Sequence, residues 1–223
     1  MQLLWPTPLL RRSLPGHAAV NTELVEMFTR DRAANGGQDT SMYSSSDDIL
    51  QRLSCLALSE LFAFVSSSVF EIAQAMNAPI WQASGAGKLQ LEIVGAWYQI
   101  QNGFGFHDIH NHGNCSWSGV YYVQLDEPSV RAAHPQLGAL NGVTRFYGHQ
   151  LGLLGGAHMD MGNAYLQASS FDAVPEAGTL MVFPSWLSHK AMPYDGISER
   201  IIVSFNAQVH GQRGDQAFRH GFH

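Results

Sequence analysis

Three histidines fall within six positions of the run 106–112, FHDIHNH, and the chain holds 11 histidines in all. In an extended strand alternate side chains share a face, so His110 and His112 can direct two imidazoles at one point. By the same alternation, His107 and Asp108 fall on opposite faces. Paired imidazoles are typical ligands of Fe, Zn, Cu and Ni, but two neighbouring ligands alone bind a metal weakly. The run therefore predicts part of a metal site, with a third ligand from a distant strand.

The best candidate for that third ligand is His189, which closes the block FPSWLSH just after the apolar run TLMVFP. Arg200 follows 11 residues later, at the start of the alternating run RIIVSFN. The residues that share one face of that run are Arg200, Ile202, Ser204 and Asn206. A lone arginine in an apolar strand is a buried cation that needs an anion, and a ligand carboxylate would meet it with bidentate geometry. Alternatives stay open for both features: the histidines lie on a surface loop or one of them is a hydrogen-bonded core residue, and the arginine pairs with one of the protein's own acids or faces solvent.

Two helices in the first third of the chain are expected to support the strands that carry these residues. The first begins at a cap formed by Asn21 or Thr22 and ends near Ala34. The second begins after the Ser46-Asp47-Asp48 cap and ends where Asn77-Ala78-Pro79 breaks the helical spacing. Its apolar residues recur at that spacing, which predicts a helix covering one face of a sheet.

From residue 88 the sequence is typical of antiparallel β structure. Short runs rich in β-branched and aromatic residues are separated by Gly-, Asn- and Pro-rich turns. These runs are KLQLEIVGAWYQIQ, GVYYVQL, GVTRFYGH, TLMVFP and RIIVSFNAQV. The weakly patterned segment 152–178 is either a functional loop or an ordered surface connection. We expect one domain over residues 1–223, with residues 1–80 as mostly helical support and residues 88–208 as the β core.

The composition sets limits on partners and location. A chain of 223 residues with 45% hydrophobic and only 13% charged residues can build a core and is a poor fit to disorder. Its formal charge of −6 gives no reason to expect nucleic acid as a partner. Two cysteines, Cys55 and Cys115, make no disulfide framework, which favours a cytoplasmic location. Glu60, the serines at 66–68 and Glu71 interrupt the one apolar region, so no membrane contact is expected, and a homodimer stays open.

Three sequence blocks in a fixed order resemble one known family. The blocks HNHGNCSWSGVYYV, FPSWLSH and RIIVSFN are similar to those of a small family of 2-oxoglutarate- and Fe(II)-dependent oxygenases, and the opening LLWPTPL also resembles that family's start. The specific motifs lie between Trp97 and Asn206. Three blocks in the right order are a far more specific signal than an HxH pair alone.

The resemblance implies both a fold and an activity. The fold would be mainly β, a double-stranded β-helix or cupin-like jelly roll with N-terminal helices packed on one sheet. The cofactors would be Fe(II), 2-oxoglutarate as co-substrate and O2. The reaction would be oxidative decarboxylation of 2-oxoglutarate coupled to hydroxylation, or a related oxidation, of a C–H bond in a small-molecule substrate.

The resemblance also assigns roles to residues. In that fold His110, His112 and His189 would converge on the iron. Arg200 would bind the distal carboxylate of 2-oxoglutarate, and Tyr122 could donate its hydroxyl to the same group, because by strand parity only one tyrosine of the pair in SGVYYV can face the pocket.

Two departures from the wider pattern affect this assignment. His112 stands where most 2-oxoglutarate oxygenases have a carboxylate ligand. Asp108 could replace it as a ligand if the strand carries a bulge. Ile202 stands where the family has a serine next to the arginine in its motif, and Ser204 is the nearest replacement on the same face.

Other residues are candidates for contact with the substrate or with the metal ligands, and rival functions remain. These residues are His107, Asp108, Trp117 and Asn206, with Trp97, Trp186 and the segment 152–178 as candidates for the cavity wall. One rival is a cupin-type three-histidine dioxygenase or isomerase that does not use 2-oxoglutarate. The other is a non-enzymatic jelly-roll binding module.

Overall fold

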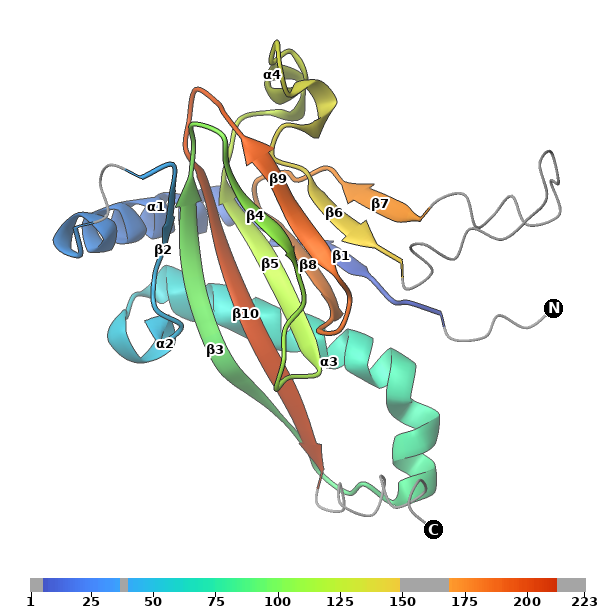
Figure 1. The fold of residues 1–223 in the computed structure, drawn as a ribbon. Coiled ribbons are helices and arrows are strands. Elements are labelled where there is room, and N and C mark those ends of the chain that lie inside the picture. Colours follow the sequence, from blue (N-terminus) through green and yellow to red (C-terminus); the bar gives the residue numbers. More distant parts are fainter. Residues whose placement is uncertain (1–5, 37–39, 149–168, 212–223) are drawn as a thin grey trace, which may run out of the picture.

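Two antiparallel sheets face one another, and helices cover the outer face of the larger sheet (Figure 1). The structure is a computed structural model that describes residues 6–36, 40–148 and 169–211. The larger sheet has the order β1 (Leu10–Ser13), β8 (Thr179–Pro184), β5 (Trp117–Gln124), β10 (Arg200–Gly211), β3 (Leu89–Gln101) and β2 (Met42–Ser44). The smaller sheet has the order β4 (Gly105–His110), β9 (His189–Tyr194), β6 (Thr144–Tyr147) and β7 (Ser170–Ala173). The helices are α1 (His17–Ala34), α2 (Ile49–Arg52), α3 (Leu56–Ser84) and α4 (Pro128–Ala132), with a 3-10 turn at Gly138–Leu140.

The strands of the larger sheet present different side chains to its two faces, as the alternation in their sequences requires. One face packs against α1 and α3 and forms the main core, which includes Tyr98, Tyr121, Val203 and Phe205. The opposite face looks toward the smaller sheet and forms a second core, which includes Val120, Tyr122, Phe183 and Ile202. The space between the two sheets therefore has apolar walls in addition to the polar residues described below.

Close packing of the neighbouring strands explains the glycine at position 119 of β5. A Cβ added at Gly119 would lie 2.3 Å from the Cζ atom of Phe205 and 2.6 Å from the backbone oxygen of Met181. Only glycine allows the neighbouring strands β8 and β10 to pack this closely against β5. The SGVYYV block thus combines a packing constraint at its glycine with two tyrosines that serve opposite faces.

All five runs predicted as strands form strands, whereas β1, β2, β7 and β9 had not been predicted. Strand β7 lies within the weakly patterned segment 152–178, of which residues 152–168 lie outside the described part of the chain. These strands have three to six residues each and contain no β-branched residue, unlike the equally short β6, whose sequence is TRFY.

Helix α1 begins at His17, four residues before the expected cap at Asn21. Asn21 instead lies inside the helix and is buried against β5. Its Nδ2 donates to the backbone oxygen of Val123 at 2.7 Å, and its Oδ1 accepts from the hydroxyl of Tyr121 at 2.7 Å. The residue type that suggested a cap is used to join the helix to the sheet.

The second helical stretch is divided in two and extends beyond its predicted end. Helix α2 follows Asp48, and α3 begins after Cys55, whose Sγ accepts from the backbone N–H of Leu58 at 3.3 Å. Helix α3 continues through Pro79 and ends at Gly85, which has the left-handed conformation typical of a helix terminus. Beyond the proline, the ring of Trp81 lies against that of Phe70 in the same helix, with centroids 6.4 Å apart, so the chain stays helical although proline removes one backbone hydrogen bond.

Helix α3 is long and apolar enough to cross a membrane by length and composition alone, contrary to the sequence-based expectation that polar residues exclude such a segment. Half of its most apolar window is buried in the protein. Its buried side chains, including Leu61, Val65 and Val69, belong to the main core against the larger sheet. A core helix passes the same test, so one such helix is weak evidence for a membrane.

Candidate active site

Strand β4 is irregular, and its irregularity decides which side chains face the space between the sheets. Gly105 lies opposite Tyr194, His107 opposite Ala191 and His110 opposite His189, with register shifts between these pairs. Because of the shift, His107 and His110 point to the same side, although simple alternation places them on opposite faces. Their rings stack with centroids 4.0 Å apart.

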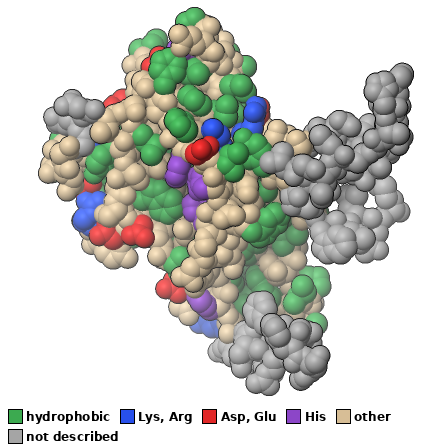
Figure 2. Space-filling view, in the orientation of Figure 1, with side chains coloured by type: hydrophobic (Ala, Val, Ile, Leu, Met, Phe, Trp, Pro, Cys, Tyr) green, Lys and Arg blue, Asp and Glu red, His purple; other side chains and the backbone are tan. Residues whose placement is uncertain are grey.

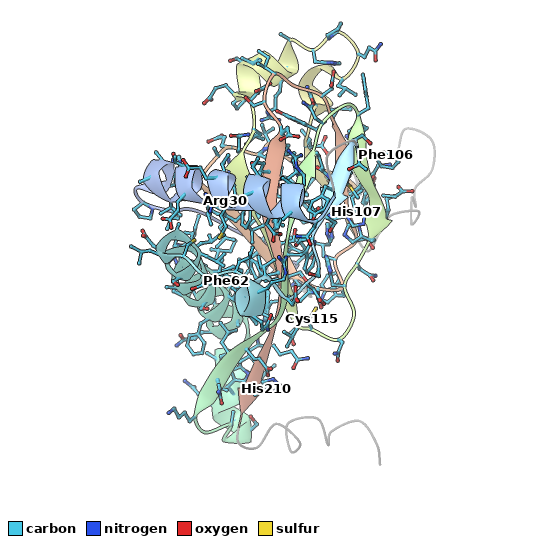
Figure 3. The ribbon with its side chains drawn as sticks, turned by 90° about the vertical axis from the view of Figure 1, so that its left-hand side faces the viewer. Arg30, Phe62, Phe106, His107, Cys115 and His210 are labelled. Atoms are coloured by element: carbon cyan, nitrogen blue, oxygen red, sulfur yellow. The ribbon has the colours of Figure 1, made fainter. Side chains whose placement is uncertain are left out.

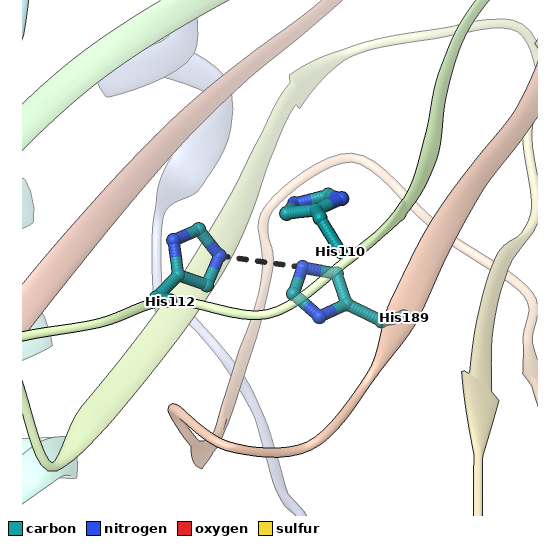
Figure 4. Close-up of side chains that lie close together, drawn as sticks. All are labelled: His110, His112 and His189. Atoms are coloured by element: carbon teal, nitrogen blue, oxygen red, sulfur yellow. Dashed lines mark hydrogen bonds between the residues drawn. The ribbon is translucent and has the colours of Figure 1, made fainter.

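Three imidazoles from different parts of the chain meet at the end of β4 (Figure 4). His110 is the last residue of β4, His112 lies two residues beyond it, and His189 is the first residue of β9. One ring nitrogen from each lies within 4.8 Å of the others. The Nε2 atoms of His112 and His189 are 3.4 Å apart. This spacing is compatible with three nitrogen ligands around one metal ion.

Backbone carbonyls orient two of these rings. The Nδ1 atom of His189 lies 2.9 Å from the oxygen of Leu187, and that of His110 lies 2.6 Å from the oxygen of Asp108. A carbonyl accepts only from a protonated Nδ1, so the Nε2 atom of each neutral ring carries the free lone pair. His112 is anchored through its backbone N–H, which donates to the oxygen of Ser185 at 2.9 Å.

Burial favours the neutral form of His189, His112 and His107. It lowers the pKa of His189 to about 3 and that of His112 to about 4, and it also lowers the pKa of His107. The same burial that disfavours the imidazolium leaves the lone pair available, and the neutral imidazole is the form that binds a metal. The donor set therefore fits a divalent transition metal without prior loss of protons from His112 and His189.

The histidines open onto a cavity of about 40 Å³ between the sheets. Its residues from the larger sheet are Trp97, Gln99, Gly119, Val120, Phe183, Arg200, Ile202 and Ser204. The remaining lining residues are His107, His110, His112, Thr144, His189 and Ala191. Figure 2 shows histidine side chains gathered near the middle of this face of the molecule, bordered by hydrophobic ones. Among the described residues, the lining contains no carboxylate.

Arg200, the first residue of β10, is a buried cation in the wall of this cavity. It is 1% exposed, and its Nη1 donates to the Oε1 of Gln101. Its Nε has no hydrogen-bond partner among the described residues, and no described carboxylate lies within 4.0 Å of the guanidinium. Burial lowers the pKa of Arg200, but a guanidinium keeps its proton in proteins. A buried cation with a free donor is the arrangement expected of a site for an anionic ligand.

The two tyrosines of SGVYYV point in opposite directions. The hydroxyl of Tyr121 reaches Asn21 of α1, whereas Tyr122 faces the smaller sheet. The hydroxyl of Tyr122 lies 2.7 Å from the Oγ1 of Thr144, and its ring is 5.5 Å from the guanidinium carbon of Arg200. Tyr122 thus lies beside the buried cation with its hydroxyl already engaged by another side chain.

The structure does not support Asp108 as a metal ligand. The side chain of Asp108 is 76% exposed and lies 3.1 Å from the Nζ of Lys190. The backbone N–H of Ile109 and this ammonium hold the pKa of Asp108 below its usual value. The strand does carry the irregularity that such a role requires, but it brings His107 rather than Asp108 to the side of His110.

The other expected contact residues are divided between the cavity and the surrounding protein. Ser204 and Trp97 line the cavity. Trp117 does not, because it belongs to the opposite face of β5 and packs into the helix-side core. Asn206 lies outside the lining and accepts from the hydroxyl of Ser118 at 2.8 Å. Trp186 is 51% exposed and also lies outside the lining.

Histidines elsewhere in the described chain stand apart from this cluster. His210, near the end of β10, lies far from His107 in Figure 3 and pairs with Glu92 at 3.1 Å. His134 pairs with Asp195 at 3.0 Å. His220 and His223 lie outside the described residues.

Three polar residues of the site were not identified from the sequence: Gln99, Gln101 and Thr144. Gln99 and Gln101 alternate with the buried Tyr98 and Ile100 in β3, which places both amides on the cavity side. That alternation was visible in WYQIQ and could have indicated an inward polar face. Thr144 carries no comparable signal, since it lies at the start of a short strand.

The arrangement of the sheets, the three convergent histidines and the buried arginine define a jelly-roll protein with a candidate metal site beside a candidate anion site. A family model described as "Putative 2OG-Fe(II) oxygenase" matches residues 95–206, about half of the chain. The chain belongs to this family. The expected family and its cofactors, Fe(II) and 2-oxoglutarate, are thereby confirmed.

Solved structures share the fold at low sequence identity. A prolyl hydroxylase from Trichoplax adhaerens, in complex with a peptide of the hypoxia inducible factor oxygen degradation domain, has a TM-score of 0.58 and 10% identity, over 94% of this chain and 85% of that chain. The non-heme alpha-ketoglutarate-dependent epimerase SnoN from nogalamycin biosynthesis has a TM-score of 0.55 and 13% identity, over 93% and 80%. HygX from Streptomyces hygroscopicus, with nickel and 2-oxoglutarate bound, has a TM-score of 0.52 and 10% identity, over 91% and 82%. These likenesses confirm the predicted double-stranded β-helix. The comparison with curated proteins finds no match.

Proposed function

We propose that this oxygenase is a dioxygenase that hydroxylates a C–H bond of a small molecule, with His110, His112 and His189 as the ligands of Fe(II). The observation that carries the proposal is that three convergent imidazoles line the same cavity as a buried arginine that has no carboxylate partner among the described residues. When bound, Fe(II) and 2-oxoglutarate supply the activation of O2 and the oxidative decarboxylation that accompanies substrate oxidation. The three protein ligands leave further coordination positions for other groups.

Arg200 is the proposed anchor for the distal carboxylate of 2-oxoglutarate. Its free Nε provides a donor, and its charge supplies the electrostatic attraction that an uncompensated buried cation gives to an anion. The ring of Tyr122 packs against the guanidinium of Arg200. The hydroxyl of Tyr122 is hydrogen-bonded to the Oγ1 of Thr144, which lines the cavity. Ser204 is the proposed hydroxyl partner on the same face of β10.

The apolar side chains that line the cavity exclude water from the site. Val120, Phe183 and Ile202 are buried and line the space beside the histidines. They limit the water that reaches the reacting groups, which strengthens the electrostatic interactions within the site. Because the described lining has one arginine, four histidines and no carboxylate, we expect a neutral or anionic small molecule as substrate.

The buried arginine also bears on the rival functions. A three-histidine dioxygenase or isomerase without 2-oxoglutarate would have no use for the uncompensated charge of Arg200, which costs stability when no anion is present. The epimerase among the structural neighbours is named as alpha-ketoglutarate-dependent, so hydroxylation is not the only outcome that this class of fold accommodates. Incorporation of one oxygen atom into the product, measured by mass spectrometry, separates hydroxylation from epimerisation.

The test is an anaerobic titration of the protein with Fe(II), with and without 2-oxoglutarate. We expect a weak visible charge-transfer band only when both are present. Arg200→Ala should raise the KM for 2-oxoglutarate much more than the KM for the substrate. Absence of the band, or equal effects on both KM values, would contradict the proposed use of 2-oxoglutarate at this site.

A further inference from the structure

Gln101, the last residue of β3, is the one described side chain that forms a hydrogen bond with the guanidinium of Arg200. The two residues are paired across strands β3 and β10, and each is 1% exposed. The Oε1 atom of Gln101 accepts from the Nη1 of Arg200. Its Nε2 donates to the Sδ of Met42 on the neighbouring strand β2 at 3.2 Å.

This arrangement fixes the orientation of the amide. A guanidinium carries only donors, so an amide turned the other way would bring its NH2 group against another donor. The amide oxygen must therefore face Arg200, and the amide nitrogen needs an acceptor on its other side. Met42 supplies that acceptor from the edge strand. The chain of contacts from Met42 through Gln101 holds one end of the guanidinium in place.

The partner of Arg200 is neutral, unlike the partners of several other arginines in the described chain. Arg32 pairs with Glu199 at 2.6 Å and Arg145 pairs with Asp172 at 2.6 Å, so a carboxylate neutralises each of these charges. Gln101 accepts a hydrogen bond without supplying a negative charge. The buried charge of Arg200 thus remains available to a ligand.

The other elements packed around Arg200 in the described part of the chain supply no negative charge either. Tyr122 from β5 and Tyr194 from β9 are the groups that interact electrostatically with it, and both are buried phenols. Arg131 of α4 is a second buried cation nearby, whose pKa is lowered first by burial and also by the charge of Arg200. The surroundings therefore increase the preference of this position for an anion.

We propose that Gln101 is a positioning residue for 2-oxoglutarate: it holds the guanidinium of Arg200 through a neutral acceptor and leaves its charge for the dicarboxylate. This inference rests on the proposed role of Arg200 as the carboxylate anchor. It has a specific consequence for a nearly isosteric change. A glutamate at position 101 would neutralise Arg200 from within the protein and compete with the co-substrate for it.

The test compares Gln101→Glu with Gln101→Met in the full-length protein. Gln101→Met keeps the length of the side chain and removes the acceptor, whereas Gln101→Glu keeps the acceptor and adds the charge. Binding of 2-oxoglutarate and of glutarate, a dicarboxylate without the keto group, is measured by calorimetry. Thermal unfolding is measured with and without glutarate, and Co(II) binding reports on the histidines.

We expect Gln101→Met to weaken 2-oxoglutarate binding about threefold or more and Gln101→Glu to weaken it more than tenfold. Gln101→Glu should also abolish the thermal stabilisation by glutarate, while Co(II) affinity stays within twofold of wild type. A purely structural role for Gln101 predicts the reverse order, because the glutamate preserves the hydrogen bond to Arg200.

Unchanged binding in Gln101→Glu, or greater damage in Gln101→Met, would overturn the inference about Gln101. If Gln101→Glu does not fold, unchanged 2-oxoglutarate binding in Gln101→Met would overturn it as well. Two other results would contradict the proposed function itself. In one, wild type binds no 2-oxoglutarate; in the other, Arg200→Met binds it as tightly as wild type.

Discussion

Substitution of the buried Arg131 is expected to lower the free energy of unfolding, whereas substitution of the buried Arg200 is expected to raise it. Arg131 is 3% exposed, and its guanidinium donates to three backbone oxygens. These belong to Asp126, Asn141 and Pro175, at 2.9, 2.6 and 2.7 Å. Arg200 is equally buried, but Gln101 is its one hydrogen-bond partner in the described chain, and its Nε is left free. Arg131 is therefore a structural clamp, whereas Arg200 costs stability until an anion binds.

The change in the free energy of unfolding depends on which polar groups each substitution leaves without a partner. The double variant Arg200→Met/Gln101→Met removes the buried charge together with its acceptor, so no polar group is orphaned. It loses the hydrogen bond between Arg200 and Gln101 and the cation–π contact with Tyr122, and it avoids the desolvation of an ion. The net effect of replacing buried charged groups with apolar ones of similar volume, these losses included, ranges from neutral to a stabilisation of about 1–4 kcal/mol. We expect a net gain of about 1–3 kcal/mol in the free energy of unfolding, because no described carboxylate compensates the desolvation of Arg200.

Arg131→Met should act in the opposite sense, because it leaves three carbonyls without their donor. At about 1–3 kcal/mol for each unsatisfied group, the free energy of unfolding should fall by about 3 kcal/mol or more. In a domain of this size each kcal/mol corresponds to about 2–4 °C in melting temperature, so the melting temperatures of the two variants should differ by about 8 °C or more.

The assay is urea unfolding of the metal-free proteins, followed by circular dichroism without any dicarboxylate. A second series contains 2-oxoglutarate at about 100 times its Kd, which should stabilise wild type by about 2.7 kcal/mol and the double variant not at all. A loss of stability in Arg200→Met/Gln101→Met similar to that in Arg131→Met would refute the reasoning, since Arg200 would then be a satisfied structural residue.

Two further predictions concern the histidines. His189→Ala should weaken Co(II) binding at least tenfold in calorimetry. Asp108→Asn should change Co(II) affinity less than twofold, because Asp108 points to solvent and pairs with Lys190. A large effect of Asp108→Asn would show that Asp108 is a metal ligand. The second prediction concerns acid stability of the metal-free protein, because burial lowers the pKa of His189 from 6.5 to about 3. Native His189 stays neutral while the unfolded chain takes up a proton below pH 6.5, so its stabilising contribution is present above that pH and is lost as the pH falls. At pH 5 this contribution to the free energy of unfolding has fallen by about 2 kcal/mol. Between pH 8 and pH 5 the free energy of unfolding in urea should therefore fall by about 2 kcal/mol more in wild type than in His189→Gln. Equal losses in the two proteins would show that His189 is not held neutral.

Much of the fold and the candidate site could be read from the sequence because strand alternation and motif order are local signals. Parity alone separates Tyr121 from Tyr122, and the structure places these two side chains on opposite faces. The same parity puts Ser204 on the cavity side with Arg200. Both β5 and β10 are long and paired on two sides, and their side chains keep alternating between the faces although the pairing of the two strands shifts register between Ile201 and Ile202.

The sequence does not predict side-chain orientation where a strand departs from regular alternation or where the orientation depends on a strand distant in the sequence. Strand β4 has two register shifts, and these bring His107 to the side of His110 and leave Asp108 outside. No local pattern marks such a shift, because it depends on the pairing with β9. Trp117, a candidate contact residue, lies on the face of β5 that it shares with Tyr121, and this face packs against the helices.

The charges of the site give a reason why a third histidine and a neutral Gln101 belong together. Three neutral imidazoles, one guanidinium, a divalent metal and a doubly charged dicarboxylate sum to one net positive charge in the loaded site. A carboxylate at position 112 would remove that charge, and a carboxylate at position 101 would remove it before the co-substrate arrived. The chain has neither, and the described lining adds no other acid. A site that stays positive when loaded favours a neutral or anionic substrate over a cationic one.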